Sequence, residues 1–174
     1  MKTSIALAFL IFAAATVSAE PVKVGSFTFA APKGWKTVAP SSPMRKAQLE
    51  IAKGSDKAEV AFFQFEAGQG GSAADNVTRW FAQFPGSEAK HITENVQSGS
   101  VKITYVMTEG TFDSGMPGGT ATPKPGYGLC GAILETTSGN VFIKMTGPNE
   151  IVKSATAAFK KMVSDAVKET KPQA

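Results

Sequence analysis

The 174-residue sequence contains one cysteine and one histidine. A lone Cys130 cannot form an intrachain disulfide, so hydrophobic packing must hold the fold together. Metal sites in proteins bring several His, Cys or carboxylate ligands together, and the carboxylates of this sequence are dispersed. We therefore predict no metal site and no cofactor. Cys130 lies in the apolar run YGLCGAILE (127–135), which indicates a small buried side chain rather than a reactive thiol.

The scarcity of histidine also restricts catalysis. Hydrolysis by a serine or cysteine nucleophile needs a neighbouring base, usually a histidine. His91 is the one candidate; it stands at the expected start of a strand, and no G-x-S-x-G nucleophile motif accompanies it. We predict that the protein is not an enzyme, and we keep a hydrolase that uses His91 as the less favoured alternative.

Charge of one sign is not concentrated anywhere in the sequence. The formal net charge is +4, and acidic residues separate most of the lysines. Nucleic-acid binding uses a dense basic patch combined with aromatic side chains. Because no segment has that composition, we predict no nucleic-acid partner.

A long apolar run is also missing. The first residues, MKTSIALAFLIFAAATVSAE (1–20), place Lys2 before an apolar stretch from Ile5 to Ala15, and the small-residue pattern VSA before Glu20. The stretch is shorter than the ~20 residues of a membrane-spanning helix, and the pattern is typical of a signal peptide. We predict cleavage after Ala19, a periplasmic or secreted protein without a stable membrane span, and a protein or small-molecule partner in the cell envelope.

Residues 20–170 have the periodicities of a single α+β domain, with a frayed polar tail at 171–174. Apolar residues at helical spacing predict helices over 73–84 and 149–168. The pattern indicates a mainly antiparallel sheet of about 7–8 strands, built from hairpins, with both helices packed on it. The expected strands lie near 22–29, 35–38, 47–52, 58–65, 91–97, 101–112, 127–137 and 140–147.

The glycine-rich stretch FEAGQGGSAADN (65–76) resembles a phosphate-binding turn at first sight. It lacks the lysine of a P-loop and the third glycine of a dinucleotide-binding fingerprint. Ser72 and Asp75 instead have the spacing of a capping box at a helix start. The favoured interpretation is a structural turn, and the alternative is one wall of a ligand or anion pocket, formed by Gly68, Gly70, Gly71 and Ser72.

A second candidate surface is the segment DSGMPGGTATPKPG (113–126). Its four glycines and three prolines argue against a helix or a central strand. At this length a connection is either a binding loop or a mobile insertion. We take Met116, Pro117, Pro123 and Lys124 as its candidate contact residues.

Four stretches together resemble a known fold. They are FTFAAPKGW (27–35), VTRWFAQF (77–84), GYGLCGAILE (126–135) and NVFIKMTGP (140–148), followed by the closing amphipathic helix. In this order they resemble small exported bacterial proteins of unknown function, whose layout is similar to the PsbP-like fold of a photosystem II extrinsic subunit and a Ran-binding nuclear import factor. The resemblance implies a non-catalytic accessory or binding role. Its motifs are structural, so it identifies no functional residue in this sequence.

Two hypotheses for the function remain in favour after these exclusions. The first is a non-enzymatic exported accessory or binding protein whose contact surface includes the 113–126 loop. The second is a small-ligand or anion-binding domain with a pocket near the 66–72 loop.

Overall fold

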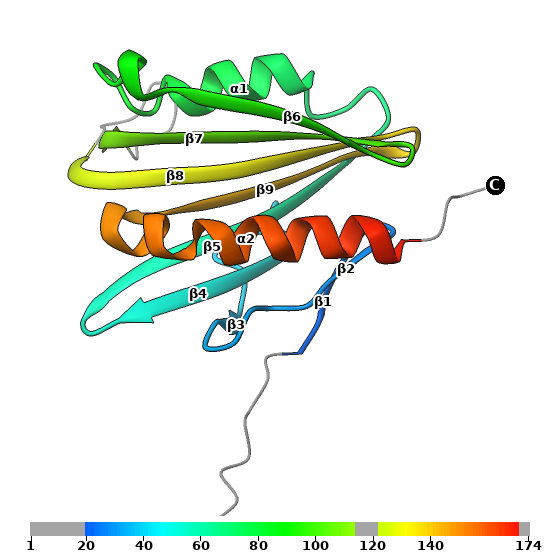
Figure 1. Ribbon diagram of the computed structural model, residues 1–174, viewed down its shortest axis with the longest axis horizontal. Helices are drawn as coiled ribbons and strands as arrows, with labels where there is room; N and C mark the ends of the chain where they lie inside the picture. The colour runs from blue at the N-terminus through cyan, green and yellow to red at the C-terminus, as the bar shows by residue number, and fades with distance from the viewer. Residues whose placement is uncertain (1–19, 114–121, 171–174) are drawn as a thin grey trace, which may run out of the picture.

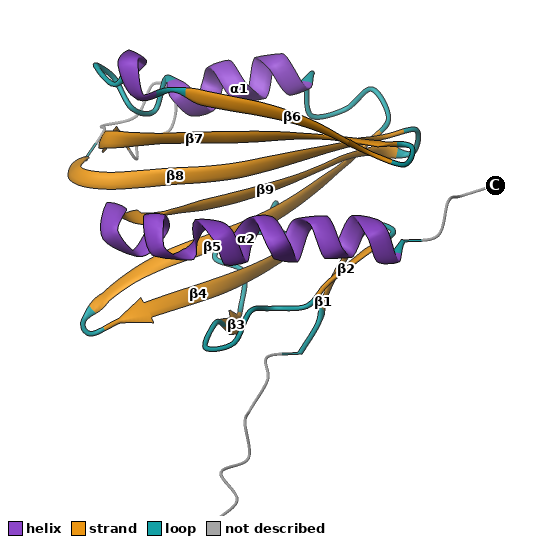
Figure 2. Ribbon diagram, in the orientation of Figure 1, coloured by secondary structure: helices purple, strands orange, loops and turns teal. Residues whose placement is uncertain are grey.

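The computed structural model describes residues 20–113 and 122–170, so the predicted signal peptide, the tail 171–174 and residues 114–121 lie outside it. A seven-stranded antiparallel sheet has the order β3-β4-β5-β9-β8-β7-β6, beside a two-stranded sheet, β1-β2 (Figures 1 and 2). The α-helices are α1 (Ala73–Phe81) and α2 (Asn149–Glu169). The strands are β1 (Val22–Val24), β2 (Phe27–Phe29), β3 (Lys36–Val38), β4 (Ala47–Lys53), β5 (Asp56–Glu66), β6 (Ile92–Ser98), β7 (Val101–Asp113), β8 (Pro123–Thr136) and β9 (Gly139–Pro148).

The predicted α+β class, the antiparallel sheet and its hairpins are confirmed. β4 pairs with β5, β6 with β7, and β8 with β9, each antiparallel and each joined by a short turn. Residues 22–29, expected as one strand, instead form a separate hairpin that turns at Gly25, whose φ of 61° suits glycine. The hairpin's aromatic side chains are buried, and the Phe29 and Phe62 rings lie 5.2 Å apart.

The two helices cover opposite faces of the large sheet. α2 packs with Ala132 and Leu134 of β8, whereas α1 packs with Leu129 and Ile133 of the same strand. Successive residues of a strand point to opposite faces, so this alternation places one core on each side. Figure 1 shows α2 in front of the sheet, running roughly along β9 and covering part of β5. Cys130 is fully buried, as predicted, and burial raises the pKa of its thiol to about 12.

α1 lies close to the sheet because the β8 residue beneath Trp80 is Gly131, which has no side chain. The six-membered ring of Trp80 occupies the space where a Cβ atom of Gly131 would stand. Trp80 and Phe84 are buried, as the helical stripe predicts. The helix itself ends at Phe81, earlier than the predicted 84, and Phe84 enters the core from the turn that follows. Within the described part of the chain, no helix has the length and apolar content to cross a membrane.

The segment 113–126 is not a continuous loop, and this expectation is wrong. Asp113 ends β7, and residues 123–126 begin β8, with Asp113 paired to Pro123 and Phe112 to Lys124. Proline and glycine are tolerated here because this end of β8 extends beyond the last β9 partner, Pro148, which pairs with Tyr127. A two-stranded ribbon therefore forms both ends of the segment.

Replacing Trp80 with alanine should remove the largest contact between α1 and the sheet. Trp80 is 7% exposed, and truncating a buried tryptophan costs about 3–5 kcal/mol. Urea unfolding measures the change, with Thr78→Ala, an exposed position on the same helix, as the control that should stay within about 0.5 kcal/mol. A loss below about 1 kcal/mol for Trp80→Ala would contradict this packing.

Candidate functional site

The glycine-rich turn that follows β5 is fixed by backbone geometry. Gly68, Gly70 and Gly71 have φ values of 78°, 78° and 79°, a region that favours glycine. A Cβ atom at Gly70 would lie 2.7 Å from the Phe65 ring. These glycines therefore have a structural reason to be glycine, independent of any ligand.

The start of α1 is closed by its own side chains. Ser72 Oγ accepts a hydrogen bond from the Asp75 amide at 3.1 Å, and Asp75 Oδ2 accepts one from the Ser72 amide at 3.3 Å. The Ser72 hydrogen bonds hold the pKa of the Asp75 carboxyl below its usual value. The predicted capping box is confirmed. A phosphate at this end would compete with Asp75 for the same amides.

A groove nevertheless runs beside this turn, between α1 and the sheet. Its volume is about 450 Å³, within the range of small-molecule sites. Of the predicted pocket residues, Gly70 and Gly71 line it, whereas Gly68 and Ser72 do not. We call it the α1 groove; its lining is Met44, Phe63, Phe65, Gly70, Gly71, Asp75, Asn76, Arg79, Trp80, Gln83, Phe142 and Lys144.

Lys144 gives the α1 groove its chemical character. The side chain donates a hydrogen bond to Gln83 Oε1, and its Nζ lies 5.9 Å from the centre of the Trp80 ring and 5.4 Å from that of Phe112. Among the described residues it forms no ion pair. Burial lowers the pKa of Lys144 to about 8, with smaller contributions from nearby charges.

Lys144 was not among the predicted site residues, although the sequence contains a signal for it. Lys144 is the one charged residue in NVFIKMTG (140–147), and it shares a strand face with Phe142. A lysine on the same face as a buried aromatic residue could have been flagged as a buried amine. Its partner could not, because Gln83 comes from a different part of the chain.

Two of the other predicted contact residues are described, Pro123 and Lys124, and neither lines the α1 groove. Lys124 is exposed on the ribbon, where its Nζ lies 5.5 Å from the centre of the Tyr127 ring. Pro123 pairs with Asp113 at the end of the described ribbon. Met116 and Pro117 lie outside the described residues.

His91 contacts a serine, but the hydrogen bonds run in the wrong direction for catalysis. Ser87 Oγ donates its proton to the Phe84 carbonyl at 2.6 Å and lies 3.2 Å from His91 Nε2. With that proton already used, His91 must be the donor to Ser87. A nucleophilic serine requires the reverse arrangement. The His91 ring also stacks on Phe81, 3.8 Å between centroids, so its contacts are structural.

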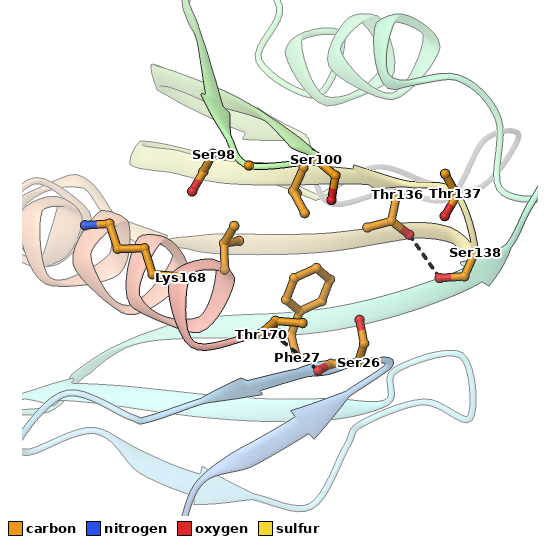
Figure 3. A pocket seen from close by; sticks show the side chains of 12 residues that line it. Ser26, Phe27, Ser98, Ser100, Thr136, Thr137, Ser138, Lys168 and Thr170 are labelled. Atoms are coloured by element: carbon orange, nitrogen blue, oxygen red, sulfur yellow. Dashed lines mark hydrogen bonds between the residues drawn. The ribbon is translucent and has the colours of Figure 1, made fainter. Parts of the chain in front are cut away.

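A second cavity, of about 310 Å³, lies where three turns meet the end of α2 (Figure 3). It is rich in hydroxyl groups, but several of these are bonded locally: Thr136 to Ser138 at 3.1 Å, and Thr170 to the Ala166 carbonyl at 2.7 Å. The carbonyl end of a helix also disfavours anions. Lys168 is the one charged residue that lines this cavity, and it is exposed, so its amine is solvated rather than buried.

A third cavity contains Glu109, whose carboxylate is already satisfied. It is 2.7 Å from Lys153 Nζ and 3.3 Å from Lys90 Nζ, and it accepts a hydrogen bond from Asn149. Hydrogen bonds from Lys153, Asn149 and Lys90 lower the pKa of Glu109 to about 2. The cluster attaches the start of α2 to β7, which is a structural role. No group of three His, Cys, Asp or Glu side chains suited to a metal occurs in residues 20–113 and 122–170.

Comparison with known structures identifies the fold of this chain. The structure is similar to the solution structure of cyanobacterial PsbP (CyanoP) from Synechocystis sp. PCC 6803, with a TM-score of 0.51 and 10% sequence identity, covering 80% of this chain and 84% of that chain. No protein-family model and no curated protein matches the sequence. The chain has a PsbP-like fold, as the resemblance implied. At this identity the likeness concerns the fold alone.

Replacing Lys144 with methionine should stabilise the protein at neutral pH. A folded-state pKa of about 8, below the usual value of 10.5, means that folding disfavours the charged amine, by roughly 1–3 kcal/mol. Above pH 8 the folded state loses this proton first, so the destabilisation that Lys144 itself causes decreases up to about pH 10.5. The advantage of Lys144→Met should therefore shrink over that interval. Urea unfolding at pH 7 and pH 10 measures it, and a variant less stable than wild type at pH 7 would contradict the prediction.

Proposed function

We propose that this chain is an exported, non-catalytic binding protein whose ligand site is the α1 groove. Export rests on the signal-peptide pattern of residues 1–19. The absence of catalysis rests on the hydrogen-bond direction at Ser87 and His91. The binding site rests on one observation above all, the Lys144 amine held among aromatic rings without a carboxylate partner in the described chain.

The loss of folding stability that Lys144 causes supports a functional role for this residue. Burying an amine without a countercharge destabilises a protein, and the side chain has a neutral replacement of similar length in methionine. Perturbed ionisable groups in a concave, aromatic-lined site are typical of binding and active sites. In the cavity that contains Glu109, the charges pair with one another and are explained by the fold. In the hydroxyl-rich cavity, Lys168 is exposed to solvent and carries no cost of burial.

Protein NMR with a fragment library tests the location of the site. The sequence has two tryptophans, and Trp80 lines the groove whereas Trp35 belongs to the core on the α2 side. Bound fragments should shift the Trp80 indole N–H and the Lys144 amide and leave the Trp35 indole unchanged. Fragments that shift only Ser98–Val101 or Ser138 would assign the site to the hydroxyl-rich cavity, and no hits would contradict the proposal.

The ribbon of β7 and β8 favours a second function, that of an accessory protein whose contact surface includes residues 113–126. Residues 122–126 are all exposed, although they are ordered as strand from Pro123 onwards. At the base of the ribbon the rings of Phe112 and Tyr127 stack, with centroids 6.0 Å apart. This base gives the exposed strands a fixed position, which suits contact with another protein.

A photo-crosslinking residue placed at Lys124 tests the ribbon. Illuminated cell envelopes should give one discrete crosslinked product from position 124 and none from Lys57, an exposed control on a different hairpin. Equal crosslinking from the two positions would indicate random collisions and contradict a contact surface on the ribbon.

A further inference from the structure

The charge and shape of the α1 groove indicate which ligand it takes. We propose that the α1 groove binds a small monoanion with a flat apolar body, such as an aromatic carboxylate, with its charged group at Lys144 and Gln83. This inference rests on the proposed binding function and names its ligand class.

The charges around the groove leave a positive excess at one end. Arg45 binds both oxygens of Glu59 at 3.0 Å, so that pair is neutral. Asp75 is engaged in the capping box, and Arg79 donates a hydrogen bond to Asn76. Lys144 and Arg79 are therefore the two cations without a carboxylate partner among the described residues that line the groove.

The walls of the groove are flat and apolar. The Phe65 and Trp80 rings each meet the Phe142 ring edge to face, at 5.7 Å and 6.5 Å between centroids. Phe63 completes the aromatic lining on β5, and Met44, 63% exposed, stands at the mouth. Aromatic and thioether surfaces of this kind pack well against a planar ring.

The arrangement also gives the ligand a direction. Asp75 lies at the start of α1 and Gln83 just after its end, about 12 Å further along at 1.5 Å per residue. A negative group is repelled near Asp75 and attracted near Lys144, so the ring should point toward the glycine-rich turn. One buried amine and one exposed guanidinium match a single negative charge better than a phosphate dianion, since the amides of the α1 start are already occupied.

A carboxylate beside Lys144 should change its protonation. The groups facing the amine are Gln83 just after α1, Arg79 of α1, the Trp80 and Phe112 rings, and the Arg45–Glu59 pair. Glu59 is the one group among them with a negative charge. An added carboxylate would favour the charged amine further and raise the pKa of Lys144 from about 8. Binding should therefore take up a proton near pH 8.5 and none at pH 6.5, where the amine is already charged.

Calorimetric titration with 2-naphthoate and with 2-naphthalenemethanol tests the inference, because the two share a ring and differ in charge. We expect the acid to bind at least tenfold more tightly at pH 7. The preference should disappear in Lys144→Met and persist in Lys102→Met, a surface lysine paired with Glu135. The enthalpy of naphthoate binding should depend on the ionisation enthalpy of the buffer at pH 8.5 but not at pH 6.5.

The outcomes separate the inference from the function on which it rests. If acid and alcohol bind equally and both shift the Trp80 indole N–H, the α1 groove is a binding site but not an anion site. An acid preference that survives in Lys144→Met would also overturn the role of this amine. If neither compound shifts the Trp80 signal, both the inference and the proposed groove fail.

Discussion

The contact between Trp80 and Gly131 determines how the second face of the sheet is built. Because no side chain stands at Gly131, the indole ring reaches the sheet backbone and brings α1 close to it. That closeness forms the wall of the α1 groove and places Gln83 within hydrogen-bonding reach of Lys144. A larger residue at Gly131 would lift the helix and separate these groups, so the site depends on the absence of one side chain.

Local patterns in the sequence predicted the structure correctly where it depends on residues within one short segment. The capping box of Ser72 and Asp75, the hairpins and the apolar face of α1 are interactions between residues close in the chain. The error at 113–126 has a physical cause. Proline and glycine disrupt a strand that has neighbours on both sides, but these residues lie on a ribbon where each strand has one partner. The Lys144 site could not be predicted, because its groups meet only when α1 covers β9.

Lys144 differs from Glu109 and Asp75, two other charged groups beside cavities, because its charge is not used to stabilise the fold. Glu109 is surrounded by donors, and Asp75 completes a helix cap, so each contributes to the fold. Lys144 has an amide oxygen and aromatic rings as neighbours and carries a lowered pKa. This contrast is the main support for the proposed ligand, which would supply the missing charge.

The pairing of β5 with β9 has a consequence for how the protein is made. Glu66 pairs with Gly139 and Glu59 with Thr146, so the two halves of the sheet join only after nearly the whole chain is available. The β1–β2 hairpin likewise packs in the same core as α2, the last helix. Such long-range contacts slow folding. A chain crossing a membrane from its N-terminus would therefore stay unfolded during passage and acquire its structure only on the far side, which suits the export that its first residues predict.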